Sequence, residues 1–176
     1  MRRTGLVVAA LAVLAGCSDR PRAPSLGDEP EFNNSHEGLR FLAPVGWVLS
    51  AKSNLPPDSS PKERSLVMYH SPPTAPPARF EVSRADLPEA ADLKAFAAAP
   101  SYGSEGVWQP AGEPAAVTVG GRPAARFRFT NQQRVKETTA VRLGERVYFF
   151  NTVTTIADEE VRRQLRQTIA DVKWTK

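Results

Sequence analysis

Residues 115–155 contain four strand-like segments that are separated only by very short turns. The segments are Ala115–Val119, Arg122–Thr130, Arg134–Leu143 and Arg146–Thr155, and the last is rich in the Val, Tyr, Phe and Thr residues that favour strands. Gly120-Gly121 forms the first turn, because paired glycines suit the positive φ angles of a tight hairpin. Asn131–Gln133 and Gly144-Glu145 supply the other turns. The pattern predicts an antiparallel meander.

An amphipathic helix is predicted after the last of these strands. Asp158 stands at its N-cap position, and the carboxylates of Glu159 and Glu160 interact favourably with the helix dipole. The apolar stripe of the helix consists of Val161, Leu165, Ile169 and Val172. We expect this stripe to pack on the sheet.

A second helix is predicted within Pro88–Ala99. Its apolar residues, at helical spacing, are Leu93, Phe96 and Ala97. Asp92 or Asp86 is expected to cap its start, and Pro100 and Gly103 to end it.

Shorter strands are predicted in the N-terminal half, at Leu39–Leu42, Trp47–Leu49, Ser65–Tyr69 and Arg79–Val82. Pro44 and Gly46 are expected to form a turn between the first two strands. Trp47–Leu49 then either pairs with Leu39–Leu42 in a hairpin, which the spacing fits, or continues that strand. Residues 71–78 contain four prolines, which cannot donate ladder hydrogen bonds, so a stiff surface loop is expected. The alternative is a polyproline-II ligand for an aromatic groove of a partner.

Three parts of the chain together resemble a known family. They are Gly38–Trp47, with an apolar strand followed by Pro, Val, Gly and Trp; the central hairpin Val119–Arg126; and Glu145–Tyr148 leading into the terminal helix and Trp174. This order resembles the PsbP-like fold of the photosystem II extrinsic protein and of the Mog family, which many bacterial lipoproteins also contain. The resemblance covers residues 35–176. It implies an α+β domain in which a mostly antiparallel β-sheet is flanked by helices in an α/β/α sandwich. It also implies a function in binding or assembly, because the family consists mainly of such proteins and has no shared set of catalytic residues.

The N-terminus has the pattern of a lipoprotein signal peptide. Met1-Arg2-Arg3 is a positive n-region, Gly5–Ala15 is an apolar h-region, and the lipobox Leu14-Ala15-Gly16-Cys17 follows. The 13 residues from Gly5 to Cys17 are fewer than the roughly 20 that a transmembrane helix needs. We therefore expect residues 1–16 to be removed and Cys17, the only cysteine, to be acylated and inserted in a lipid bilayer.

Residues 17–34 are predicted to form a flexible tether, because Pro21, Pro24 and Pro30 occur among almost no large apolar residues. The domain is then expected to span residues 35–176. Ser18 after the acylated cysteine favours the outer membrane, facing the periplasm, in a host with two membranes, although Asp19 follows it.

The charge and the reactive side chains of the mature chain exclude several classes of function. Loss of Arg2 and Arg3 leaves 21 basic against 19 acidic residues, a formal charge of +2, so nucleic-acid binding is not expected. His36 and His70 are the only histidines, and no further cysteine accompanies them, so neither a metal site nor a cofactor is predicted. No nucleophile-elbow signature is present, and a strand follows Gly120-Gly121 where a phosphate cradle requires a helix.

Two classes of function remain. The first is a membrane-tethered, non-enzymatic binding or assembly module of the cell envelope. The second is an envelope small-ligand carrier or hydrolase with a site of carboxylates, Arg and Tyr. A deep, enclosed pocket with convergent carboxylates would favour the second class, and a flat surface patch the first.

Five cations are predicted to gather on one face of the sheet and bind an anionic partner, such as lipid headgroups, an envelope polymer or an acidic protein surface. They are Arg126, Arg128, Arg134, Lys136 and Arg142. The alternative is that their long stems cover apolar sheet while their charged ends reach water or pair with Glu. Tyr102 and Trp108 form a second candidate patch, because they lie in a glycine-containing loop.

Overall fold

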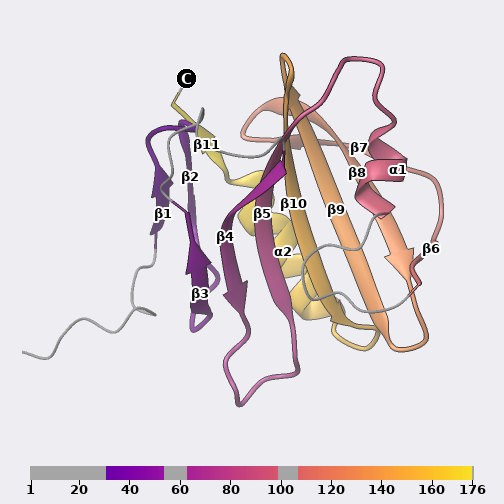
Figure 1. Cartoon of the computed structure of the whole chain (residues 1–176). Helices are drawn as coiled ribbons and strands as arrows, with labels where there is room; N and C mark the ends of the chain where they lie inside the picture. The colour runs from indigo at the N-terminus through magenta and orange to yellow at the C-terminus, as the bar shows by residue number, and fades with distance from the viewer. Residues whose placement is uncertain (1–30, 54–62, 99–106, 176) are drawn as a thin grey trace, which may run out of the picture.

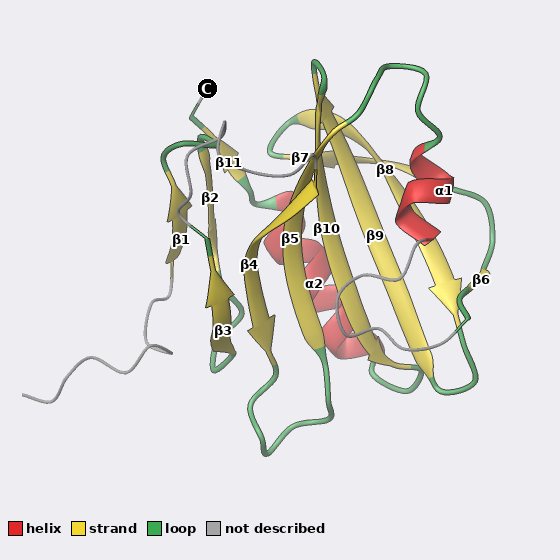
Figure 2. Cartoon of the chain, viewed as in Figure 1, coloured by secondary structure: helices red, strands yellow, loops and turns green. Residues whose placement is uncertain are grey.

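The computed structural model describes residues 31–53, 63–98 and 107–175. In these residues two antiparallel sheets and two helices form a layered α+β domain (Figure 1). The short helix α1 lies on one face of the larger sheet, and the longer helix α2 covers the other face (Figure 2). The predicted fold class, a mostly antiparallel sheet between helices, is confirmed.

The larger sheet has the strand order β3-β4-β5-β10-β9-β8-β6, and β7 also pairs with β8. Its strands are β3 (Val48–Lys52), β4 (Glu63–His70), β5 (Arg79–Asp86), β6 (Gln109–Pro110), β7 (Ala115–Val119), β8 (Arg122–Thr130), β9 (Arg134–Leu143) and β10 (Arg146–Thr155). The four strands of the meander have the predicted bounds. β10 is central, and eight of its ten residues are buried. Its second neighbour, β5, comes from far away in the sequence and runs antiparallel to it.

A smaller sheet of three strands was not predicted. It consists of β1 (Glu31–Asn34), β2 (Leu39–Leu42) and β11 (Lys173–Trp174), in the order β1-β2-β11. The predicted end of the tether at residue 34 is therefore wrong. The reason is Phe32, which is buried and packs its ring against that of Phe41, with the ring centroids 5.0 Å apart.

The predicted hairpin between Leu39–Leu42 and Trp47–Leu49 is also wrong. β2 pairs with β1 and β11, whereas β3 pairs with β4 in the larger sheet. The Trp47 N–H donates to the Pro44 carbonyl over 3.1 Å, and Gly46 takes a φ of 77°. This turn redirects the chain from one sheet to the other, because both edges of β2 are already occupied.

Helix α1 (Leu93–Ala98) begins where Asp92 caps it. The Asp92 carboxylate accepts hydrogen bonds from the backbone N–H groups of Lys94 and Ala95, at 2.9 and 3.1 Å. The Phe96 ring stacks on Phe149 of β10 with centroids 4.6 Å apart. The face of the larger sheet that α1 covers is called the α1 face below. The predicted terminators Pro100 and Gly103 lie outside the described residues.

Helix α2 (Glu159–Ala170) packs on the opposite face, called the α2 face below. Leu165, Ile169 and Val172 are buried in one core cluster with Tyr148 and Phe150 of β10, and Val161 is partly buried against it, so the predicted stripe is confirmed. Asp158 occupies the N-cap position, but its carboxylate accepts a hydrogen bond from the Thr155 hydroxyl and does not cap the helix.

The turn between β7 and β8 joins the larger sheet to the C-terminal segment. The Gly120 N–H donates to the Ala170 carbonyl at 3.1 Å, and the Trp174 indole N–H donates to the Val119 carbonyl at 2.9 Å. A Cβ atom on Gly120 would lie 2.2 Å from the Val172 carbonyl oxygen. Glycine is required at position 120 by this close approach as well as by its φ of 56°.

Candidate functional site

The five cations predicted to share a sheet face do not do so. The β8–β9 register places Phe129 opposite Lys136 and Arg128 opposite Glu137. Because side chains alternate between faces along a strand, Arg126 and Arg128 lie on the α2 face. Arg134, Lys136 and Arg142 lie on the α1 face. The predicted cluster is therefore split between the two sides of the sheet.

Burial separates these side chains further. Lys136 is 1% exposed, and its ammonium group lies 5.9 Å from the centre of the Phe129 ring. Arg142 is half-buried and donates to the Leu87 carbonyl at 2.9 Å. Arg128 and Arg134 are exposed. Lys136 therefore cannot serve as a surface contact in the way the sequence pattern indicates.

The other candidate residues can also be placed. Trp108 is buried in the core cluster under α1, and Tyr102 lies outside the described residues. His36 lies in the turn between β1 and β2, and His70 ends β4. Across the described ranges, no group of three His, Cys, Asp or Glu residues is close enough to hold a metal ion.

A buried carboxylate joins the β1–β2 turn to the larger sheet. The Glu37 backbone N–H donates to the Asn34 side chain at 3.1 Å, and the Glu37 side chain is fully buried. One carboxylate oxygen accepts from Arg64 and, at 3.3 Å, from Arg84; the other accepts from the Tyr148 hydroxyl at 2.8 Å. No local sequence pattern predicts this cluster, because its members come from four separate elements.

The ionisation of this cluster follows from its contacts. Burial raises the pKa of Glu37, but the hydrogen bonds from Tyr148 and Arg64 and the positive charge of Arg84 outweigh burial, so its net pKa is lowered. Burial and the hydrogen bond to Glu37 raise the pKa of Tyr148 to about 12. Glu37 is thus an ionised carboxylate with both oxygens already bonded. We infer a structural role for it, because a general base must have an oxygen available to accept a proton.

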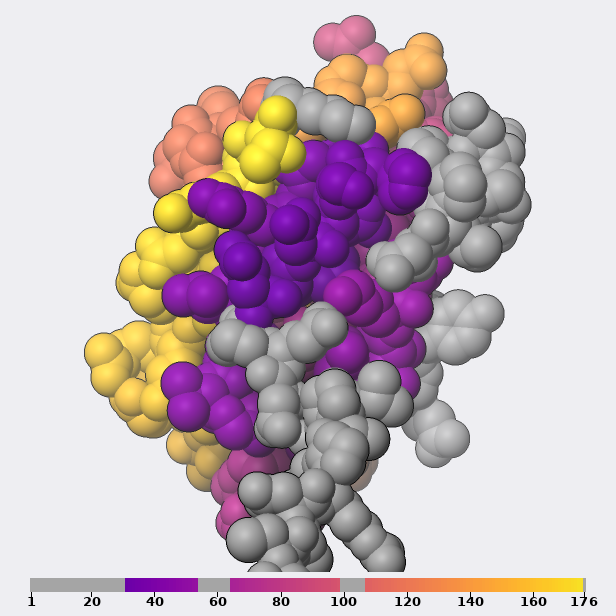
Figure 3. Space-filling view, turned by 90° about the vertical axis from the view of Figure 1, so that its left-hand side faces the viewer, coloured from indigo at the N-terminus to yellow at the C-terminus, as the bar shows by residue number. Residues whose placement is uncertain are grey.

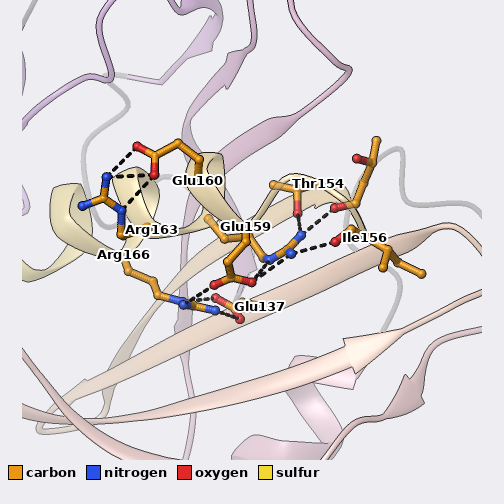
Figure 4. A network of polar contacts seen from close by, with 9 residues as sticks. Glu137, Thr154, Ile156, Glu159, Glu160, Arg163 and Arg166 are labelled. Atoms are coloured by element: carbon orange, nitrogen blue, oxygen red, sulfur yellow. Dashed lines mark hydrogen bonds and ion pairs between the residues drawn. The ribbon is translucent and has the colours of Figure 1, made fainter.

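A second ionic network, shown in Figure 4, fixes α2 on the sheet. Arg166 donates to both oxygens of Glu137 on β9, at 2.8 and 2.6 Å, and also to Glu159 at 2.9 Å. Arg162, buried in α2, donates to the Thr154 hydroxyl at 3.0 Å and to the Ile156 carbonyl at 2.8 Å. The bond to Glu137 raises the pKa of Arg166 above its ordinary value. Both oxygens of the Glu137 carboxylate are therefore bonded to an arginine, as those of Glu37 are bonded to Arg64, Arg84 and Tyr148.

An open groove of about 1330 Å³ lies between α2 and the smaller sheet. We call it the α2 groove. Its lining includes Arg40, Leu42, Val45, Arg163, Asp171 and Lys173. Leu42 is 67% exposed and Val45 is fully exposed, so apolar side chains face solvent there. Figure 3 shows the indigo N-terminal strands beside the yellow C-terminal segment, the two parts of the chain that border this groove.

The charged residues of the α2 groove are of both signs. Its described lining has three cations, Arg40, Arg163 and Lys173, and two carboxylates, Glu31 and Asp171. Glu31 lies 3.9 Å from Arg40, and Asp171 accepts a hydrogen bond from Gln167. The carboxylates therefore have separate partners, and Arg163 is paired with Glu160 of α2 at 2.7 Å. The groove combines apolar contact area with charges that nearly balance.

Comparisons with known proteins concern the fold. No protein-family model matches the sequence, and no curated protein matches it significantly. The solution structure of cyanobacterial PsbP (CyanoP) from Synechocystis sp. PCC 6803 matches with a TM-score of 0.58 at 14% identity, covering 82% of this chain and 91% of that chain. LpqN of Mycobacterium tuberculosis, a protein involved in cell envelope biogenesis, has a TM-score of 0.48 at 17% identity, with 78% and 83% covered. The likeness to CyanoP confirms the PsbP-like fold.

Proposed function

We propose that this chain is a lipid-anchored, non-enzymatic binding or assembly module of the bacterial cell envelope, and that its partner docks in the α2 groove. The observation that carries the proposal is the open groove with exposed Leu42 and Val45. Solvent-exposed apolar residues rimmed by polar ones are typical of interaction sites. Two buried carboxylates, Glu37 and Glu137, are bonded to arginines, which favours a structural role for them over a role in hydrolysis.

The chemistry of the groove indicates the kind of partner. Apolar Leu42 and Val45 suit an apolar side chain of the partner, and the cations Arg40 and Lys173 at the border of the groove suit acidic groups beside it. An envelope protein with an exposed apolar and acidic segment has both properties. An anionic polymer would use the cations alone and leave the apolar residues without a contact.

The anchor is the part of the proposal that rests on the sequence. The lipobox Leu14–Cys17 and the tether up to residue 30 lie outside the described residues. None of the described helices is long and apolar enough to cross a bilayer. An acylated Cys17 would hold the domain at the membrane, and Ser18 favours the outer membrane, facing the periplasm, if the host has two membranes.

Cys17→Ser is expected to prevent acylation, because the hydroxyl replaces the thiol that accepts the diacylglycerol group. The variant should remain an unlipidated precursor and should not sediment with membranes as a processed lipoprotein. Labelling with radioactive palmitate, together with membrane fractionation, measures both effects. Ser25→Ala, in the same tether, is the matched control and should be processed normally. A processed, acylated Cys17→Ser chain would refute the anchor.

A further inference from the structure

A second hollow, of about 390 Å³, lies on the larger sheet and shares no lining residue with the α2 groove. It is lined by Met68 and His70 at the end of β4, by Arg79 at the start of β5, and by Arg134 and Val153 of β9 and β10. These strand ends meet at the lower edge of the sheet in Figure 1, beside the loop that joins β4 to β5. We call this the Arg79 hollow.

The sheet register gathers cations around this hollow. His70 lies opposite Arg79, Arg79 opposite Val153, and Val153 opposite Lys136. Residues that are directly opposite share a face, so all four side chains form one row on the α1 face, and Arg134 lies on the same face two residues before Lys136. Basic residues from β4, β5 and β9 thus come together, although they are far apart in the sequence.

Burial and charge make the Arg79 side chain unusual. Arg79 is 8% exposed although it lines the hollow. Burial lowers the pKa of Arg79, the charge of Glu81 raises it, and the like charge of Arg134 lowers it again. The next row of the α1 face contains Met68, Glu81 and Asn151, which lie opposite one another on β4, β5 and β10. Arg79, Arg134 and Lys136 thus come together on one face of the sheet, with Glu81 as the carboxylate of these two described rows.

We propose that the Arg79 hollow binds a small anion, a carboxylate or phosphate group carried on a short apolar chain. The guanidinium groups of Arg79 and Arg134 bind the anionic group, because arginine presents several N–H donors in a planar fork that matches carboxylate and phosphate oxygens. Met68 and Val153 contact the apolar chain. The volume lies at the lower end of the range of small-ligand sites, about 300–1,000 Å³.

The site is distinct from the α2 groove. Its residues lie on the α1 face, whereas the groove lies between α2 and the smaller sheet, and the two share no lining residue. Anion binding in the hollow can therefore be tested separately from partner docking in the α2 groove. Failure of the docking proposal would leave the anion-binding proposal unaffected.

The test uses the full chain, isotope-labelled and solubilised in a non-ionic detergent, with inorganic phosphate, monobutyl phosphate and butyrate as probes. We expect saturable NMR shifts centred on His70 and Arg79. Monobutyl phosphate should bind about tenfold more tightly than inorganic phosphate, because its butyl group covers Met68 and Val153. Butyrate shows whether a carboxylate suffices.

Arg134→Gln, at the exposed side of the hollow, should weaken the affinity for monobutyl phosphate about tenfold, because a charged hydrogen-bond donor is lost. Arg128→Gln is the matched control, because Arg128 is an exposed arginine on the opposite face, and it should change the affinity less than twofold. Arg79→Gln should abolish saturable binding in a chain whose near-ultraviolet circular dichroism shows native packing. Should Arg79→Gln fail to fold, Arg134→Gln decides. Absence of saturable shifts, or equal weakening by Arg128→Gln and Arg134→Gln, would overturn the proposal.

Discussion

Glu37→Gln is expected to lower the free energy of unfolding by about 3–5 kcal/mol, the usual cost of removing one partner from a buried ion pair. The Glu37 side chain is fully buried, and Arg64 and Arg84 beside it are each 6% exposed. Arg64 would lose its bond to this carboxylate, and Arg84 would keep its pair with Asp86 but lose the one with Glu37. Urea denaturation at neutral pH measures the loss. Glu31→Gln is the matched control, because Glu31 is exposed and lies 3.9 Å from its partner Arg40, so its loss should change stability little.

The same carboxylate predicts a dependence of stability on pH. The pKa of Glu37 is lower in the folded chain than its ordinary value, so its contribution is present above about pH 4.3 and is lost as the pH falls through the folded-state pKa. The difference in stability between the parent and Glu37→Gln should therefore shrink on acidification. A difference that stays constant between neutral and acidic pH would contradict the ionised, arginine-bonded state of Glu37.

Leu165→Ala is expected to cost about 2–5 kcal/mol of stability, as truncation of a buried leucine does. Leu165 is 1% exposed and lies in the core between α2 and the larger sheet. Gln164→Ala changes the neighbouring, exposed residue of the same helix and should stay within about 0.5 kcal/mol of the parent. Equal denaturation midpoints for Leu165→Ala and the parent would show that α2 does not support the sheet.

The sequence was sufficient for those parts of the fold that local signals determine. The turns at Gly120-Gly121 and Gly144-Glu145 set the limits of the meander strands, and Asp92 marks the start of α1. Pairing between distant segments carries no local signal. The register of β5 with β10 and the smaller sheet that joins β1, β2 and β11 follow from core packing, which buries Phe32 and packs the partly buried Trp174 against the core.

The candidate site was harder to predict because one residue of register decides the face. In the β8–β9 turn the Asn131 N–H donates to the Arg134 carbonyl at 3.1 Å. The register that follows places Phe129 opposite Lys136. This pairing sets odd-numbered residues of β8 opposite even-numbered residues of β9. Arg128 and Lys136 thus lie on opposite faces. The sequence identified Arg134 and Lys136 as basic residues of interest, but their neighbour Arg79 comes from a strand that only the structure brings beside them.

Site-specific photo-crosslinking in the native envelope tests the central claim, that a partner docks in the α2 groove. A photoreactive residue is placed at Val45, which is fully exposed in the groove, and in a second strain at Ile156, an apolar residue that is 50% exposed outside it. Mass spectrometry then identifies the adducts. We predict a discrete crosslinked envelope protein from position 45 and none from position 156. Absence of an adduct at position 45, or the same adducts from both positions, would contradict the account.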